Sequence, residues 1–140
     1  MTLSKRSLEK LEGVHPHLQQ IVMKAVDLSP VAFCITEGVR SYDRQKKLVA
    51  QGASKTMNSR HLTGHAVDLA AMIDPDDDGN FEISWKWHLY ATLANAMKAA
   101  ALEIVGPERL EWGGDWLTFK DGAHFQLSWQ YYPANPPIEA

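Results

Sequence analysis

Two histidines, His61 and His65, lie shortly before an aspartate, Asp68. Histidines four apart can bind zinc from one helix face, but that motif has a glutamate directly after the first histidine. Here Leu62 takes that place, and Gly64 disfavours a helix. An aspartate among alanine, valine and leucine is costly to bury unless a cation or hydrogen bonds compensate it. We therefore predict that His61 and Asp68 bind one divalent metal ion.

A second pair of residues that can bind a metal ion or transfer protons, Asp121 and His124, lies further along the chain, three residues apart across a glycine turn. Two histidines, one carboxylate and an open position for water make up a typical catalytic zinc site. His124 is thus the predicted third ligand, and Asp121 is left to carry protons. Simpler alternatives stay open: an Asp-Gly turn for Asp121, a core position for His124, and an ion pair between Asp68 and Arg60.

These residues together resemble the signature of the D-alanyl-D-alanine carboxypeptidase and dipeptidase family of zinc peptidases. The matching positions are Ser59, His61, Gly64, Ala66 and Asp68, followed by Asp121 and His124. The resemblance implies that the two outer histidines and Asp68 hold one Zn²⁺ and that Asp121 is the catalytic base. It also implies the hedgehog/DD-peptidase fold of the metallo-DD-peptidases.

Two further residues take roles from the same resemblance. Arg40 matches the arginine that contacts the substrate and the developing oxyanion, a task suited to a permanently charged side chain with several donors. A structural ion pair with Glu37 or Asp43 is the alternative for Arg40. Ser59 either contacts substrate or orients the His61 loop.

The segment Trp112–Trp116 most resembles phage endolysins that cut the L-alanyl-D-glutamate bond of peptidoglycan stem peptides. Trp116, in a glycine-rich turn, is expected to line the substrate cleft. Trp85, Trp87 and Trp112 are expected to pack in the core. The competing functions are a D,D-carboxypeptidase or D-alanyl-D-alanine dipeptidase, and a non-catalytic, zinc-stabilised module that binds the cell wall.

An acidic loop carries oxygen-bearing side chains at alternate positions, like the first half of an EF-hand calcium loop. These residues are Asp74, Asp76, Asp78, Asn80 and Glu82. The twelfth position, where a bidentate glutamate belongs, is Trp85. A Ca²⁺ site that modulates activity and a solvated acidic turn are therefore both open.

The elements that must position these residues follow from residue periodicity. Helices are predicted at 4–12, 16–28, 41–50 and 85–102, where apolar residues recur at helical spacing or a capping residue begins the segment. Strands are predicted at 31–36, 66–73, 110–112 and 124–127. This order predicts an α+β fold, with helices packed on a small, mainly antiparallel sheet.

Composition limits the class of protein. The chain has 140 residues, enough for one catalytic domain over 1–140 and no separate wall-binding domain, and we expect a monomer. A net charge of -3 argues against nucleic-acid binding. There is neither a membrane-spanning run nor a secretory signal. We therefore expect synthesis in the host cytoplasm, and the resemblance to phage endolysins implies action on the wall after release through a holin.

Overall fold

The computed structural model describes residues 2–54 and 56–134, which form helices on both sides of one small sheet. The α-helices are α1 (Lys5–Lys10), α2 (Pro16–Leu28), α3 (Tyr42–Ala50) and α4 (Trp87–Ile104). The strands are β1 (Ala32–Glu37), β2 (Ala66–Ile73), β3 (Glu82–Ser84), β4 (Leu110–Trp112) and β5 (His124–Leu127). Three 3₁₀ turns complete the described elements: η1 (Arg60–Thr63), η2 (Pro107–Arg109) and η3 (Gly113–Asp115).

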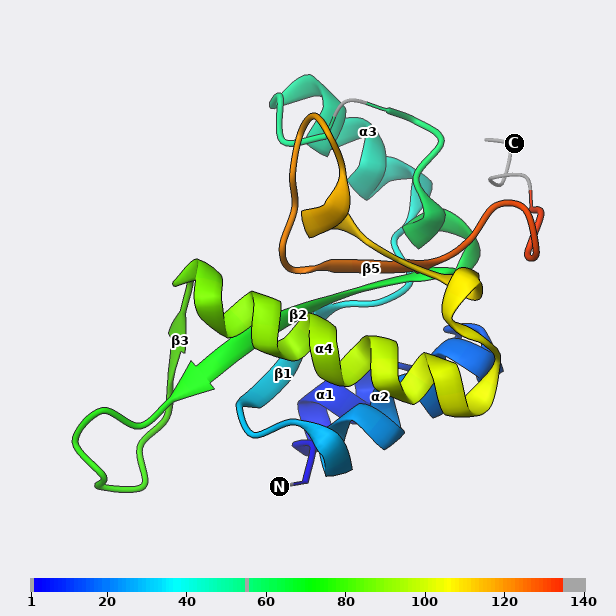
Figure 1. Cartoon of the computed structure of the whole chain (residues 1–140). Coiled ribbons are helices and arrows are strands. Elements are labelled where there is room, and N and C mark those ends of the chain that lie inside the picture. The colour runs from blue at the N-terminus through cyan, green and yellow to red at the C-terminus, as the bar shows by residue number, and fades with distance from the viewer. Residues whose placement is uncertain (1, 55, 135–140) are drawn as a thin grey trace.

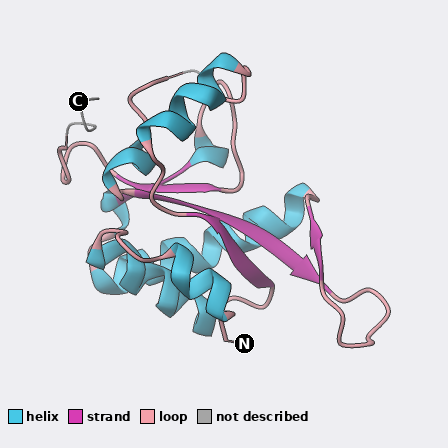
Figure 2. Ribbon diagram, turned by 180° about the vertical axis from the view of Figure 1, so that it is seen from behind, coloured by secondary structure: helices cyan, strands magenta, loops and turns pink. Residues whose placement is uncertain are grey.

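The sheet has the strand order β1-β2-β5-β4, with β3 pairing with β2, and each of these pairs is antiparallel. The long strand β2 therefore lies at its centre (Figure 1). The hairpin of β2 and β3 projects from the body and carries the acidic loop at its tip, as Figure 2 shows from behind. The predicted α+β fold with a mainly antiparallel sheet is confirmed.

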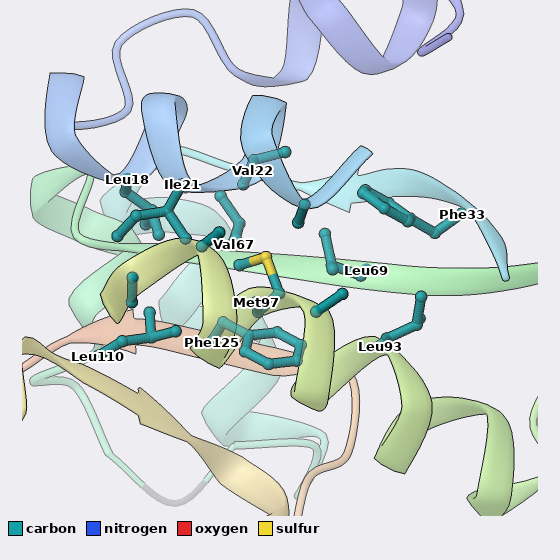
Figure 3. Close-up of a cluster of buried hydrophobic side chains, with 14 of the residues drawn as sticks. Leu18, Ile21, Val22, Phe33, Val67, Leu69, Leu93, Met97, Leu110 and Phe125 are labelled. Carbon is teal, nitrogen blue, oxygen red and sulfur yellow. The ribbon is translucent and has the colours of Figure 1, made fainter. Parts of the chain in front are cut away.

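One face of the sheet packs on α2 and α4 to make the hydrophobic core (Figure 3). Because side chains alternate along a strand, Val67 and Leu69 of β2 point into this core and are fully buried. Phe125 of β5 does the same, and Met97 of α4 packs against them. Asp68 and His124, between these apolar neighbours, therefore face the opposite side of the sheet.

Two of the three tryptophans that were expected in the core are exposed instead. Trp112 is buried as predicted, but Trp85 and Trp87 are 67% and 51% exposed, so their expected core positions are wrong. The start of α4 explains the error: the helix begins at Trp87, so these two residues belong to its exposed first turn and the loop before it. No helix in the described part of the chain is long and apolar enough to cross a membrane.

Candidate active site

An open cavity of about 500 Å³ lies on the face of the sheet opposite the core. Side chains of β2, β5 and β4 form its floor, namely Asp68, His124, Gln126 and Glu111. Residues of the α3 region and of the loop after β4 also line it. Each predicted catalytic or zinc-binding residue lies on this cavity: His61, Asp68, His124, Asp121 and Arg40.

His61 is placed by the short turn η1, which begins immediately after Ser59. The Ser59 hydroxyl accepts a hydrogen bond from the backbone N–H of His61 at 3.2 Å, so Ser59 caps the turn. The His61 ring is almost fully buried, and its Nδ1–H donates to the carbonyl of Gly38 at 2.8 Å. A carbonyl can only accept, so Nδ1 carries the proton and the opposite nitrogen, Nε2, faces Asp68 at 3.2 Å.

His124 is placed by strand pairing, because its Cα partner across the sheet is Asp68. Its Nδ1 lies 3.2 Å from Oδ1 of Asp68, the same oxygen that His61 approaches. Its other nitrogen, Nε2, is 2.8 Å from the side-chain oxygen of Gln126. Two imidazole nitrogens therefore meet one carboxylate oxygen.

The chemistry of this donor set fits a shared cation. The ligand atoms of His61, Asp68 and His124 all lie within 4.8 Å of one another. A neutral His61 with Nδ1 protonated turns the lone pair of Nε2 toward a carboxylate, which is unfavourable unless a proton or a metal ion lies between them. Two histidines and one aspartate are also the donors of a catalytic zinc site with an open position.

The pKa values of Asp68 and His124 are shifted in the directions expected for a carboxylate in contact with imidazoles. Burial alone would raise the pKa of Asp68, but its close contacts with the rings of His124 and His61 outweigh burial and hold the pKa well below its usual range. Burial alone would lower the pKa of His124, yet its contact with Asp68 raises it. Asp68 therefore stays ionised and attracts positive charge to this point of the cleft.

Asp121 stands at the edge of the same cleft, in the turn that leads into β5. Its backbone N–H donates to the carbonyl of Gly113, and a side chain at that glycine would collide with Asp121. Its Oδ1 accepts from Ala123 N–H at 3.3 Å, so it also makes the turn considered from the sequence. Burial, followed by repulsion from Asp68, raises its pKa. A carboxyl with a raised pKa suits proton transfer.

Arg40 lies beside the cluster, and its side chain is held by two partners. Nε and Nη2 donate to the two carboxylate oxygens of Glu37 at 2.7 and 2.6 Å, and Nη1 donates to Gln45 at 2.7 Å. The ion pair with Glu37 is therefore present, whereas no ion pair joins Arg40 to Asp43 in the described part of the chain. Nη2 also lies 3.8 Å from Oδ2 of Asp68. A guanidinium has five N–H donors, so these three bonds leave two for a ligand in the cleft.

The other predicted residues divide into cleft and non-cleft positions. Trp116 lines the cavity, and its ring centroid is 5.2 Å from that of His124. His65 points elsewhere, with Nδ1 at 2.7 Å from the Thr63 hydroxyl. In the exposed acidic loop, both carboxylate oxygens of Asp74 accept backbone N–H groups of the loop itself. These bonds explain the turn, and the calcium site stays a prediction.

Sequence reasoning missed several polar residues of the cleft. Glu37 reaches the site because the register of β1 shifts between Ile35 and Glu37, which sets Glu37 opposite Asp68. Such a bulge turns a side chain to the other face, and no local pattern reveals it. Gln126 and Glu111 alternate with core residues in their strands. That alternation could have indicated that both side chains lie on the cleft face of the sheet.

An antiparallel sheet that presents two imidazoles, a carboxylate and a second acid to an open cleft has the layout of a metallopeptidase. A family model described as phage L-alanyl-D-glutamate peptidase matches residues 1–127, and the chain belongs to this family. It is 30% identical over 115 residues to the L-alanyl-D-glutamate peptidase of Escherichia phage T5, covering 80% of this chain and 79% of that protein.

Two further proteins are similar. The peptidoglycan L-alanyl-D-glutamate endopeptidase CwlK of Bacillus subtilis (strain 168) is 32% identical over 109 residues, which cover 66% of this chain and 59% of CwlK. The crystal structure of the Serratia marcescens L-Ala D-Glu endopeptidase ChiX superposes with a TM-score of 0.83, at 46% identity and 95% coverage of both chains.

Proposed function

We propose that this chain is a zinc-dependent endopeptidase that hydrolyses the L-alanyl-D-glutamate bond of peptidoglycan stem peptides. The observation that carries the proposal is the meeting of His61, Asp68 and His124 on the floor of the cleft, with Asp121 beside them. Family membership and the names of its relatives support the choice of bond.

In the proposed mechanism, His61, Asp68 and His124 hold Zn²⁺. When bound, zinc polarises the scissile carbonyl and lowers the pKa of a water molecule. Asp121 accepts a proton from the attacking water, whose oxygen bonds to the alanyl carbonyl carbon. As the C–N bond breaks, Asp121 returns that proton to the departing amine of D-glutamate. This two-way transfer suits a carboxyl whose pKa lies above the ordinary value.

Arg40 stabilises the negative charge that develops on the carbonyl oxygen. Glu37 and Gln45 hold its guanidinium in place, so little ordering is needed when the charge appears. This arrangement reconciles the two sequence-based alternatives, because the ion pair with Glu37 positions the same group that faces the cleft. Trp116, next to His124, supplies an apolar wall for the stem peptide.

We propose that residues 1–140 form one catalytic domain, because one core in the described part of the chain underlies the sheet that carries the site. The substrate is cell-wall peptidoglycan, and in the setting of a phage infection the enzyme reaches it after a holin opens the membrane.

The proposed bond is tested by digesting purified peptidoglycan and identifying the new termini by mass spectrometry. We expect new amino groups on D-glutamate, loss of activity with a chelator, and recovery on adding Zn²⁺. Release of free D-alanine instead would establish a D,D-carboxypeptidase or dipeptidase. An exposed carboxylate that does not line the cleft, Glu108, provides the control variant Glu108→Gln.

The same digest separates catalysis from wall binding. The variant Asp121→Asn keeps the size of the side chain but removes its basicity, so we expect zinc to remain bound while hydrolysis falls by about 10²–10⁴-fold. If Asp121→Asn degraded the wall as fast as Glu108→Gln, the catalytic assignment would be wrong. A zinc-bound protein that sediments with the wall without cutting it would instead be a binding module.

A further inference from the structure

Beyond the three proposed ligands, a row of polar side chains continues across the floor of the cleft. Gln126 follows His124 on the same face of β5, and Glu111 of β4 is the Cα partner of Gln126 across the sheet. The Gln126 amide nitrogen donates to Oε2 of Glu111 at 2.7 Å. Its amide oxygen lies 2.8 Å from Nε2 of His124. The row therefore runs Asp68, His124, Gln126, Glu111.

The direction of each hydrogen bond in this row follows from its last member. An ionised carboxylate can only accept, so Glu111 requires the NH₂ group of Gln126 to face it. The carbonyl oxygen of Gln126 must then face His124, and it too can only accept. His124 consequently carries its proton on Nε2, which leaves the lone pair of Nδ1 directed at the metal position beside Asp68.

A buried cation supports the charge of Glu111. Arg60 is 2% exposed and lines the same cavity as Glu111. The two charges therefore stabilise each other at the base of the cleft. Gln126 is itself buried, at 7% exposure. The amide oxygen and the amide nitrogen of Gln126 are thus both buried, where a polar group without a hydrogen-bond partner is costly.

We propose that Gln126 and Glu111 are positioning residues that set the ring orientation and tautomer of His124 for zinc binding. This inference rests on the proposed zinc site. Partners of this kind raise the basicity of a ligating histidine and limit its motion, and their loss typically weakens metal binding by 10–100-fold. For His61 the carbonyl of Gly38 performs the same task from the backbone, so mutation can test only the His124 side.

The test measures the zinc dissociation constant by competition with a chromophoric chelator, together with the melting temperature of each variant. Gln126→Leu removes the acceptor of His124, and we expect about 10–100-fold weaker zinc binding. Glu111→Gln leaves the Gln126 amide free to turn over, and we expect a smaller loss. Glu108→Gln makes the same chemical change on an exposed part of η2 and should bind zinc like the wild type.

A double variant separates positioning from mere structural support. Combining Glu111→Gln with Gln126→Glu puts a carboxylate next to His124, where it accepts from both His124 and the new amide. We expect this exchange to restore zinc affinity to at least the wild-type level, whereas two independent structural defects would add. The Zn²⁺ dissociation rate should recover in parallel.

The outcomes distinguish the two proposals. Wild-type protein that does not bind zinc overturns the proposed function, and this inference with it. Wild-type protein that binds zinc, with folded Glu111→Gln and Gln126→Leu binding it equally tightly, overturns only the positioning role. If Gln126→Leu does not fold, Glu111→Gln and the exchange variant decide the matter. Losses of zinc affinity that add in the exchange variant, without recovery, also overturn the positioning role.

Discussion

Arg60 offers a sharp test of how the site is held together, because its buried side chain donates hydrogen bonds to three backbone carbonyls, one at the last residue of β5 and two beyond it. Its Nε and Nη2 donate to the carbonyl of Leu127 at 3.2 and 2.9 Å. Nη2 also donates to Ser128 at 3.2 Å and to Tyr132 at 2.7 Å. The guanidinium stacks over Trp129 at 4.1 Å. Arg60 thereby joins the His61 turn to the end of the strand that carries His124.

Replacing Arg60 by methionine keeps most of the volume and removes these hydrogen bonds. A buried acceptor left without a partner costs about 1–3 kcal/mol, and three carbonyls are affected. Removing the charge recovers part of the cost of burying it. We therefore expect a loss of about 2–4 kcal/mol from the free energy of unfolding. For a chain of this size that lowers the melting temperature by roughly 8–15 °C.

The measurement is urea unfolding at 25 °C, followed by tryptophan fluorescence and circular dichroism. Arg6→Met, on the exposed side of α1, is the matched control and should change stability by less than about 0.5 kcal/mol. Arg60→Lys keeps the charge but loses the planar fork, so its stability should lie between those of the wild type and Arg60→Met. If Arg60→Met were as stable as Arg6→Met, the carbonyl contacts would not hold the end of β5.

Three further results are expected. Asp68→Asn removes the carboxylate that both histidines approach, so it should abolish zinc binding in equilibrium dialysis; retained stoichiometric zinc would refute this. Glu37→Gln loosens Arg40, so kcat should fall by about tenfold with zinc affinity unchanged; equal kcat would contradict the positioning by Glu37. Burial, then the charge of Arg60, lowers the pKa of His65 to about 4 in the folded protein. The unfolded chain takes up this proton first, so unfolding free energy should fall between about pH 6.5 and 4, by about 1–2 kcal/mol after allowing for partial exposure. Urea titrations at several pH values should show a shallower slope for His65→Gln, and an identical slope would refute the assignment.

The local elements were predictable because their signals are local. The strand 66–73 has the predicted bounds, as does the helix 16–28, and Ser41 caps its helix through Arg44 N–H. Prediction was less accurate where burial depends on distant segments. The three prolines of residues 132–140 predict an extended segment on the surface. Tyr132 is nevertheless only 7% exposed, because its hydroxyl contacts His17 and its carbonyl accepts from Arg60. The expected position of residues 135–140 lies outside the described part of the chain.

The metal-binding and acidic residues of the candidate site were predictable from the sequence, whereas the residues that hold them in position were less predictable. The motif gave His61, Asp68, Asp121 and His124, since metal-binding side chains at such spacing stand out. Their roles remain predictions, although the structure places all four on one cleft. Glu37 was named only as a possible ion-pair partner of Arg40, and its position in the cleft could not be predicted, because it depends on an irregularity in strand pairing.

The apolar residues between the site residues determine whether the site exists at all. On β5, His124 and Gln126 alternate with Phe125 and Leu127, both fully buried. A shift of one residue in strand register would turn every side chain to the opposite face. It would direct Phe125 at Asp68 and bury His124 in the core. Burial of Phe125 and Leu127 disfavours that shift, so these core residues set the register that brings His124 to Asp68.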